Sequence, residues 1–110
     1  MKLNNKEFER VFKILGEGKI LLLSPRKIKT DEDIYFATRV WLGVSYGVRY
    51  LFWHGAGSSA QSYTKRDLYF ITEDLFPECI HYKTLTRKQF DKALDRYFEA
   101  EFNKRQKELE

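Results

Sequence analysis

Apolar residues at helical spacing mark the start of the chain. Asn4, with Glu7 three residues later, has the spacing of a helix N-cap. The apolar side chains that follow recur at i, i+3, i+4 and i+7, namely Phe8, Val11, Phe12 and Leu15. Gly16 and Gly18 end the pattern. This spacing predicts a short amphipathic helix.

The next apolar run, residues 19–23, is bounded by Gly18 and by Ser24-Pro25. A short run of this kind is typical of a strand with both faces covered, or of the buried half of one.

Residues 34–54 fit two secondary structures. Thr30 and the acidic residues after it would cap a helix with apolar positions Ile34, Ala37, Val40, Trp41 and Val44. However, the segment is crowded with β-branched and aromatic residues, which fit a pleated surface. Gly43 and Gly47 also suit a turn better than a helix interior. We favour two strands joined near residues 43–47, and a helix over residues 34–46 is the alternative.

The second half of the chain predicts two helices separated by a strand. Thr64 and Asp67 repeat the capping spacing before one apolar face of Leu68, Ile71 and Leu75. Residues 79–82 indicate a short strand. Thr86, with Gln89 at the reciprocal position, caps the last helix. Its broad apolar stripe is expected to point inward: Phe90, Ala93, Leu94, Tyr97, Phe98 and Phe102.

These elements give the order α-β-β-β-α-β-α. We expect a single α+β domain over residues 1–110, with an antiparallel sheet of three to four short strands packed with three helices on one face. Residues 103–110 lose the apolar stripe and are expected to form a frayed helical tail.

Composition supports one stably folded domain. The 110 residues are 43% hydrophobic and 16% aromatic, which is enough for a core and argues against intrinsic disorder. Cys79 is the single cysteine, so no internal disulfide is possible and secretion has no support. The charged N-terminal segment is not a signal peptide, and no uncharged apolar stretch is long enough to span a bilayer. We therefore expect a cytoplasmic protein without membrane contact.

Residues 55–60 read GAGSSA and match the glycine fingerprint G-x-G-x-x-A. The nearest helix cap is Thr64, several residues further on, and the next strand ends in Lys83-Thr84 without an acidic residue for a ribose. The main interpretation is therefore a flexible strand-to-helix joint. As a weaker alternative, backbone N–H groups would hold one phosphate beside Lys65 and Arg66, from a loop that includes Gly55, Gly57, Ser58 and Ser59.

Catalytic and metal-binding patterns are weak. His54 lies near two serines, but the chain has no G-x-S-x-G elbow and no third triad member in a recognisable pattern. Cys79 and His81 alternate along a strand, yet structural zinc needs four ligands in paired spacings. We expect a non-enzymatic protein with no catalytic residue, metal or cofactor.

The two strands expected within residues 34–54 give a stronger indication of a binding surface than these patterns do. In a hairpin, one face would present Arg39, Trp41, Arg49, Leu51 and Trp53, with Tyr35 nearby. The alternative makes this the core face and turns the other set outward: Val40, Leu42, Val48, Tyr50 and Phe52. In either case one face is unusually apolar for solvent, which usually marks an interface.

Two functional hypotheses follow. The net charge of +4 fits a small nucleic-acid or nucleoprotein accessory factor. Its contacts would be Arg39, Arg49, Trp53, Lys65 and Arg66 around the glycine-serine loop. The alternative is a regulatory protein-interaction or inhibitor module, including a homodimer, that uses an aromatic sheet face. Nucleotide binding through the GAGSSA loop is the least favoured hypothesis.

Overall fold

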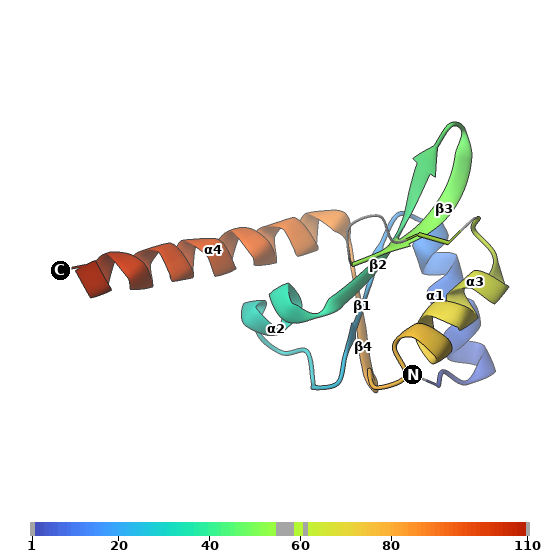
Figure 1. Cartoon of the computed structure of the whole chain (residues 1–110), viewed down its shortest axis with the longest axis horizontal. Helices are drawn as coiled ribbons and strands as arrows, with labels where there is room; N and C mark the ends of the chain where they lie inside the picture. The colour runs from blue at the N-terminus through green and yellow to red at the C-terminus, as the bar shows by residue number, and fades with distance from the viewer. Residues whose placement is uncertain (1, 55–58, 61, 110) are drawn as a thin grey trace.

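The computed structural model describes residues 2–54, 59–60 and 62–109, which form a four-stranded antiparallel sheet with helices packed against it (Figure 1). The sheet order is β3-β2-β1-β4. In chain order the elements are α1 (Asn5–Gly16), β1 (Ile20–Ser24), α2 (Asp31–Phe36), β2 (Thr38–Ser45), β3 (Val48–Trp53), α3 (Lys65–Tyr69), the π-helix η1 (Phe70–Leu75), β4 (His81–Leu85) and α4 (Arg87–Leu109). The expected α+β class is confirmed, and α2 adds one short helix to the expected order.

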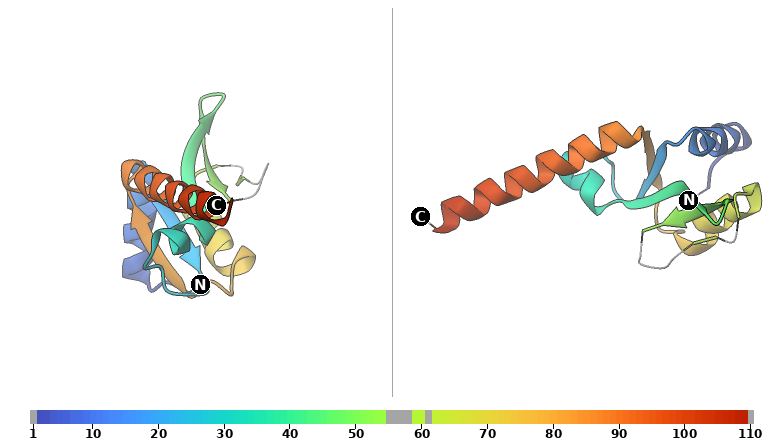
Figure 2. Two further views of the ribbon diagram at one scale, coloured as in Figure 1. Left: turned by 90° about the vertical axis from the view of Figure 1, so that its left-hand side faces the viewer. Right: turned by 90° about the horizontal axis from the view of Figure 1, so that it is seen from above.

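Helices cover both faces of the sheet, so the expectation that they pack on one face is wrong. α1, α3 and η1 enclose one hydrophobic core, whereas α2 and α4 enclose a second core on the opposite side (Figure 2). The central strand β1 serves both, because side chains alternate along a strand. Leu21 and Leu23 enter the first core, and Ile20 and Leu22 enter the second. The prediction that this strand is covered on both faces is confirmed.

Residues 34–54, which fitted both a helix and a pair of strands, contain some of each. Thr30 Oγ1 accepts the Asp33 N–H at 3.1 Å, and Asp33 Oδ2 accepts the Thr30 N–H at 2.9 Å, which completes a capping box. The helix that it starts, α2, ends at Phe36. β2 and β3 then form the expected hairpin, so the alternative of a helix over residues 34–46 holds only for its first three residues. Tyr46 and Gly47 make its two-residue turn with φ of 52° and 77°, as a type I′ turn requires.

Gly43 has a steric role in this hairpin. A Cβ atom at this position would lie 2.6 Å from the ring of Phe52. That ring also stacks on Trp41, with centroids 5.8 Å apart and planes at 18°. Glycine therefore lets an aromatic side chain lie across the strand.

The predicted N-caps are all present. Asn4 Oδ1 accepts the Glu7 N–H at 2.8 Å. Two threonines do the same at 3.1 Å, Thr64 for the Asp67 N–H and Thr86 for the Gln89 N–H. The helix that starts at Thr64 widens into η1 after Tyr69, and β4 begins two residues later than residues 79–82 predicted.

α4 projects from the body of the molecule (Figures 1 and 2). Its first turns pack Phe90 and Ala93 into the second core. Its 23 residues make a helix of roughly 34 Å at 1.5 Å per residue, and the later turns extend beyond the sheet. α4 continues as a helix to Leu109, and fraying of residues 103–110 stays a prediction.

Candidate interaction surface

The hairpin register separates the residues that were expected to share a face. Val40 is paired with Trp53, and Val44 is paired with Arg49, so Trp53 and Arg49 lie on the side of the first core. Arg39 is paired with Leu22 and lies on the side of the second core. The predicted grouping is therefore wrong. A two-residue turn pairs odd positions of one strand with even positions of the other, whereas the prediction assumed odd with odd.

Arg39 is half-buried and engaged within the chain. Its Nη2 donates to the Tyr35 carbonyl oxygen at 2.9 Å, and its guanidinium carbon lies 4.9 Å from the Phe90 ring centroid. Its Nε is buried without an acceptor among the described residues. Burial lowers the pKa of the Arg39 guanidinium. Arg39 thus joins the end of α2 to α4.

The remaining predicted contacts do not form one surface with Arg39. Trp53 is half-buried against the first core. Lys65 Nζ is paired with Glu9 Oε1 at 2.7 Å and lies 6.0 Å from the Phe12 ring centroid. Arg49 and Arg66 are exposed. Their role in nucleic-acid binding stays a prediction.

The glycine-serine loop falls largely outside the described residues, which include neither Gly55 nor Gly57 nor Ser58. At the end of the loop, the chain returns to the edge of β3. Ser59 forms an isolated antiparallel β-bridge with Phe52, and the Ala60 N–H donates to the Leu51 carbonyl oxygen at 2.8 Å. α3 begins at Lys65, as the Thr64 cap predicted.

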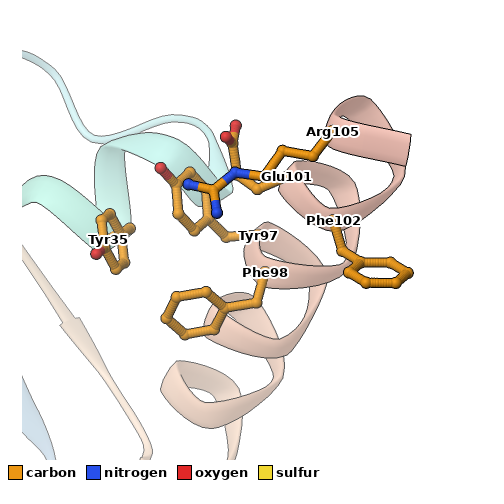
Figure 3. Close-up of a pocket in the computed structure, with 6 residues that line it drawn as sticks. All are labelled: Tyr35, Tyr97, Phe98, Glu101, Phe102 and Arg105. Carbon is orange, nitrogen blue, oxygen red and sulfur yellow. The ribbon is translucent and has the colours of Figure 1, made fainter. Parts of the chain in front are cut away.

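Four rings from α2 and α4 contact one another on the side of the sheet that faces the second core. Phe102 lies further along α4, and its ring points away from them (Figure 3). Tyr35 stacks on Tyr97 with centroids 4.2 Å apart and planes at 15°, and it meets Phe98 edge-on at 5.4 Å. Phe36 lies edge-on to Tyr35, with centroids 5.0 Å apart. We call the set the aromatic surface: Tyr35, Phe36, Tyr97, Phe98 and Phe102.

Much of the aromatic surface is open to solvent. The exposed fractions are 62% for Phe36, 52% for Phe98 and 61% for Phe102. A hollow of about 350 Å³ lies beside these rings and is lined by Tyr35, Tyr97, Phe98, Glu101, Phe102 and Arg105 (Figure 3). Scattered exposed apolar residues are normal on a protein surface, whereas these three phenylalanines belong to two helices that pack together.

Phe98 and Phe102 were expected to point inward, and this prediction is wrong. At about 100° per residue, Phe90 and Tyr97 lie on one face of α4, which packs on the body. Phe98 and Phe102 lie roughly 100° around the axis from that face. They lie on a second face that is mostly exposed, where Tyr35 of α2 meets only the Phe98 ring.

A charged pair holds α2 against α4. Arg96 donates from Nε and Nη2 to the two carboxylate oxygens of Asp31, each at 3.0 Å. The hydrogen bond from Arg96 lowers the pKa of Asp31. The pair lies beside the aromatic stacking and fixes the short helix that carries Tyr35 and Phe36.

This pair gives a pH-dependent prediction. A carboxyl group whose pKa falls on folding stabilises the protein above its unfolded pKa, and that contribution is lost as the pH falls through its folded pKa. Arg96→Gln should therefore be less stable than the wild type at pH 7, with a gap that closes below the ordinary Asp value of 3.8. Thermal unfolding from neutral to acidic pH measures this gap. Asp31→Asn should show no further loss on adding Arg96→Gln, and a gap unchanged at low pH would contradict the assignment.

The described residues contain no group of three or more His, Cys, Asp and Glu side chains placed to hold a metal ion. In the same part of the chain, no helix combines the length and hydrophobicity needed to cross a bilayer. No known protein family, curated protein or solved structure was found to match this chain.

Proposed function

We propose that this protein is a protein-interaction module and that the aromatic surface is its contact site. The observation that carries the proposal is that Phe36, Phe98 and Phe102 are each more than half exposed. The first two rings meet Tyr35 edge-on, and Phe102 lines the same hollow as Phe98. Aromatic side chains are enriched at binding hot spots, because they bury large apolar areas and lose little conformational entropy.

The position of α4 supports this function. Most of the aromatic surface lies on α4, which projects from the body and leaves its outer face accessible to another chain (Figure 1). Tyr35, stacked on Tyr97, gives the projecting helix a rigid base. A preorganised contact site loses less entropy on binding than a mobile one.

Charges of both signs accompany the aromatic residues along α4. The acidic side chains are Asp91, Asp95, Glu99 and Glu101, and the exposed basic ones include Lys88, Lys92, Arg96, Lys104 and Arg105. A mixed surface of this kind is compatible with a polypeptide partner that carries both charges.

Photocrosslinking tests the proposal. Benzoylphenylalanine in place of Phe102 should give a specific adduct in a lysate of the source cells, because that ring is at the contact. The same probe in place of Tyr46, which is fully exposed at the hairpin turn, is the matched control. We expect a nuclease-resistant, protease-sensitive adduct at position 102 alone, and the identified protein, once purified, should bind the unmodified chain. The absence of any adduct specific to position 102 would overturn the proposal.

Nucleic-acid binding is the second candidate, because one observation favours it. A hollow of about 340 Å³ is lined by Arg39, His54, Tyr35 and Phe36, and Arg39 has no carboxylate partner among the described residues. A guanidinium beside exposed rings suits a phosphate and a stacked base. A nuclease-sensitive adduct would support this candidate, as would oligonucleotide affinity that falls steeply with salt in fluorescence anisotropy.

A further inference from the structure

A heptad pattern runs along the exposed face of α4. Its positions are separated by steps of four and three residues in alternation, which is the spacing of the seam between helices of a coiled coil. All of these positions are exposed: Asp91, Asp95, Phe98, Phe102, Arg105 and Leu109. We call this set the α4 stripe. It shares Phe98 and Phe102 with the aromatic surface.

The α4 stripe is complementary to itself in one orientation. It is acidic at Asp91 and Asp95, aromatic in the middle and basic at Arg105. When two such helices run antiparallel, Phe98 of each faces Phe102 of the other, and Asp95 of each faces Arg105 of the other. The outermost pair, Asp91 and Leu109, adds no attraction. From this pattern we infer that the partner is a second copy of this chain, joined through antiparallel α4 helices. The inference rests on the proposed function and names its partner.

The parallel orientation is disfavoured by the same charges. It would place Asp95 beside the identical aspartate of the other helix and Arg105 beside the identical arginine. Like charges facing each other across an interface cost several kcal/mol. Antiparallel pairing converts both repulsions into attractions.

The charged side chains that would pair across the dimer, Asp95 and Arg105, are free of ion pairs in the described part of the chain. Arg96, next to Asp95, is held by Asp31 from α2. Asp95 and Arg105, by contrast, make no ion pair with any described residue. Both are therefore available to an approaching helix.

The shape of the molecule accommodates this pairing. Because α4 extends beyond the sheet on one side only, an antiparallel pair places the two bodies at opposite ends (Figure 1). The projecting C-terminal half of each α4 then packs along the N-terminal half of the α4 of the second copy.

Two glutamates limit the affinity. Glu99 and Glu101 flank the two-fold axis of this arrangement, so each would lie near its own copy. With a seam of this length we expect a reversible dimer with a Kd on the order of 10–100 µM, weaker than interfaces of standard size. Replacing both glutamates with glutamine should tighten it.

A charge-swap experiment tests the inference by sedimentation equilibrium up to about 1 mM protein. The wild type should form a reversible dimer. Asp95→Arg alone places two arginines together at each end, and Arg105→Asp alone places two aspartates together. Each variant by itself should dimerise at least about tenfold more weakly. An equimolar mixture of the two variants should restore the dimer, because both contacts then pair opposite charges.

The outcomes separate this inference from the proposed function. A wild type that stays monomeric, or a mixture no better than its components, overturns the antiparallel pair. If the Phe102 probe still captures a different protein, the proposed protein-interaction function stands and only the identity of its partner changes. If there is neither a dimer nor an adduct, both are overturned. Circular dichroism of each variant controls for folding, since both substituted side chains are exposed.

Discussion

Replacing Phe98 and Phe102 together with alanine should weaken partner binding by at least about 100-fold. Central aromatic anchors each contribute about 2 kcal/mol or more at an interface, and these two carry the middle of the α4 stripe. The loss of stability should be modest, because both rings are more than half exposed. The Phe98 ring lies edge-on to Tyr35, with centroids 5.4 Å apart, so its loss should cause a small decrease in melting temperature. Sedimentation equilibrium measures self-association, and calorimetric titration measures binding to any other partner identified by crosslinking.

Phe70→Ala is the matched control. Phe70 is also a partly exposed phenylalanine, but it lies in η1 on the opposite side of the sheet from α4. Binding by this variant should equal that of the wild type. Equal losses in both experiments would mean that binding depends on general hydrophobicity and not on the aromatic surface.

Leu22→Ala should give the largest loss of stability of any variant considered, about 2–5 kcal/mol. Leu22 is fully buried in the central strand, below α2 and α4. Truncation would leave a cavity between strands fixed by pairing on both sides, so the site has little freedom to collapse. Urea denaturation monitored by tryptophan fluorescence measures the free energy of unfolding.

Leu22→Ile tests whether volume is the cause. This change preserves side-chain volume and suits a strand, so it should cost less than about 1.5 kcal/mol. A loss as large as that of the alanine variant would show that shape, and not the cavity, governs the second core.

Local signals in the sequence identified most of the fold. Side-chain caps at Asn4, Thr64 and Thr86 fixed where helices begin, because they bond backbone N–H groups in the first turn. α2 was harder to predict from the sequence, since a six-residue helix is too short to be stable alone. Its stability comes from Arg96 and Tyr97, more than sixty residues away in the chain. No local pattern reports such contacts.

The hairpin shows a different limit. Its strands were predicted from β-branched and aromatic residues, but its register depends on the length of the turn. Tyr46 adopts a positive φ, although tyrosine gives no signal for a type I′ turn. A shift of one residue reverses which side chains share a face. That is why Arg39 and Trp53 were placed together in the prediction and lie apart in the structure.

The aromatic surface left a signal that the prediction overlooked. Grouping Phe98 and Phe102 with Phe90 merged two helix faces into one broad stripe. The stricter heptad from Asp91 to Leu109 is visible in the sequence and separates them. Its exposure, however, depends on where the sheet ends beneath α4, which is a property of the tertiary structure.

Cys79 provides the molecule with an internal reporter of its own opening. It is the only cysteine, it lies in the first core with 1% of its surface exposed, and burial raises the pKa of its thiol. A thiol reagent reacts with the thiolate, so labelling requires the core to open. The labelling rate therefore reports the population of open molecules at native conditions. A variant that binds weakly but is labelled at the wild-type rate has lost a contact, whereas one that is labelled faster has lost its closed core.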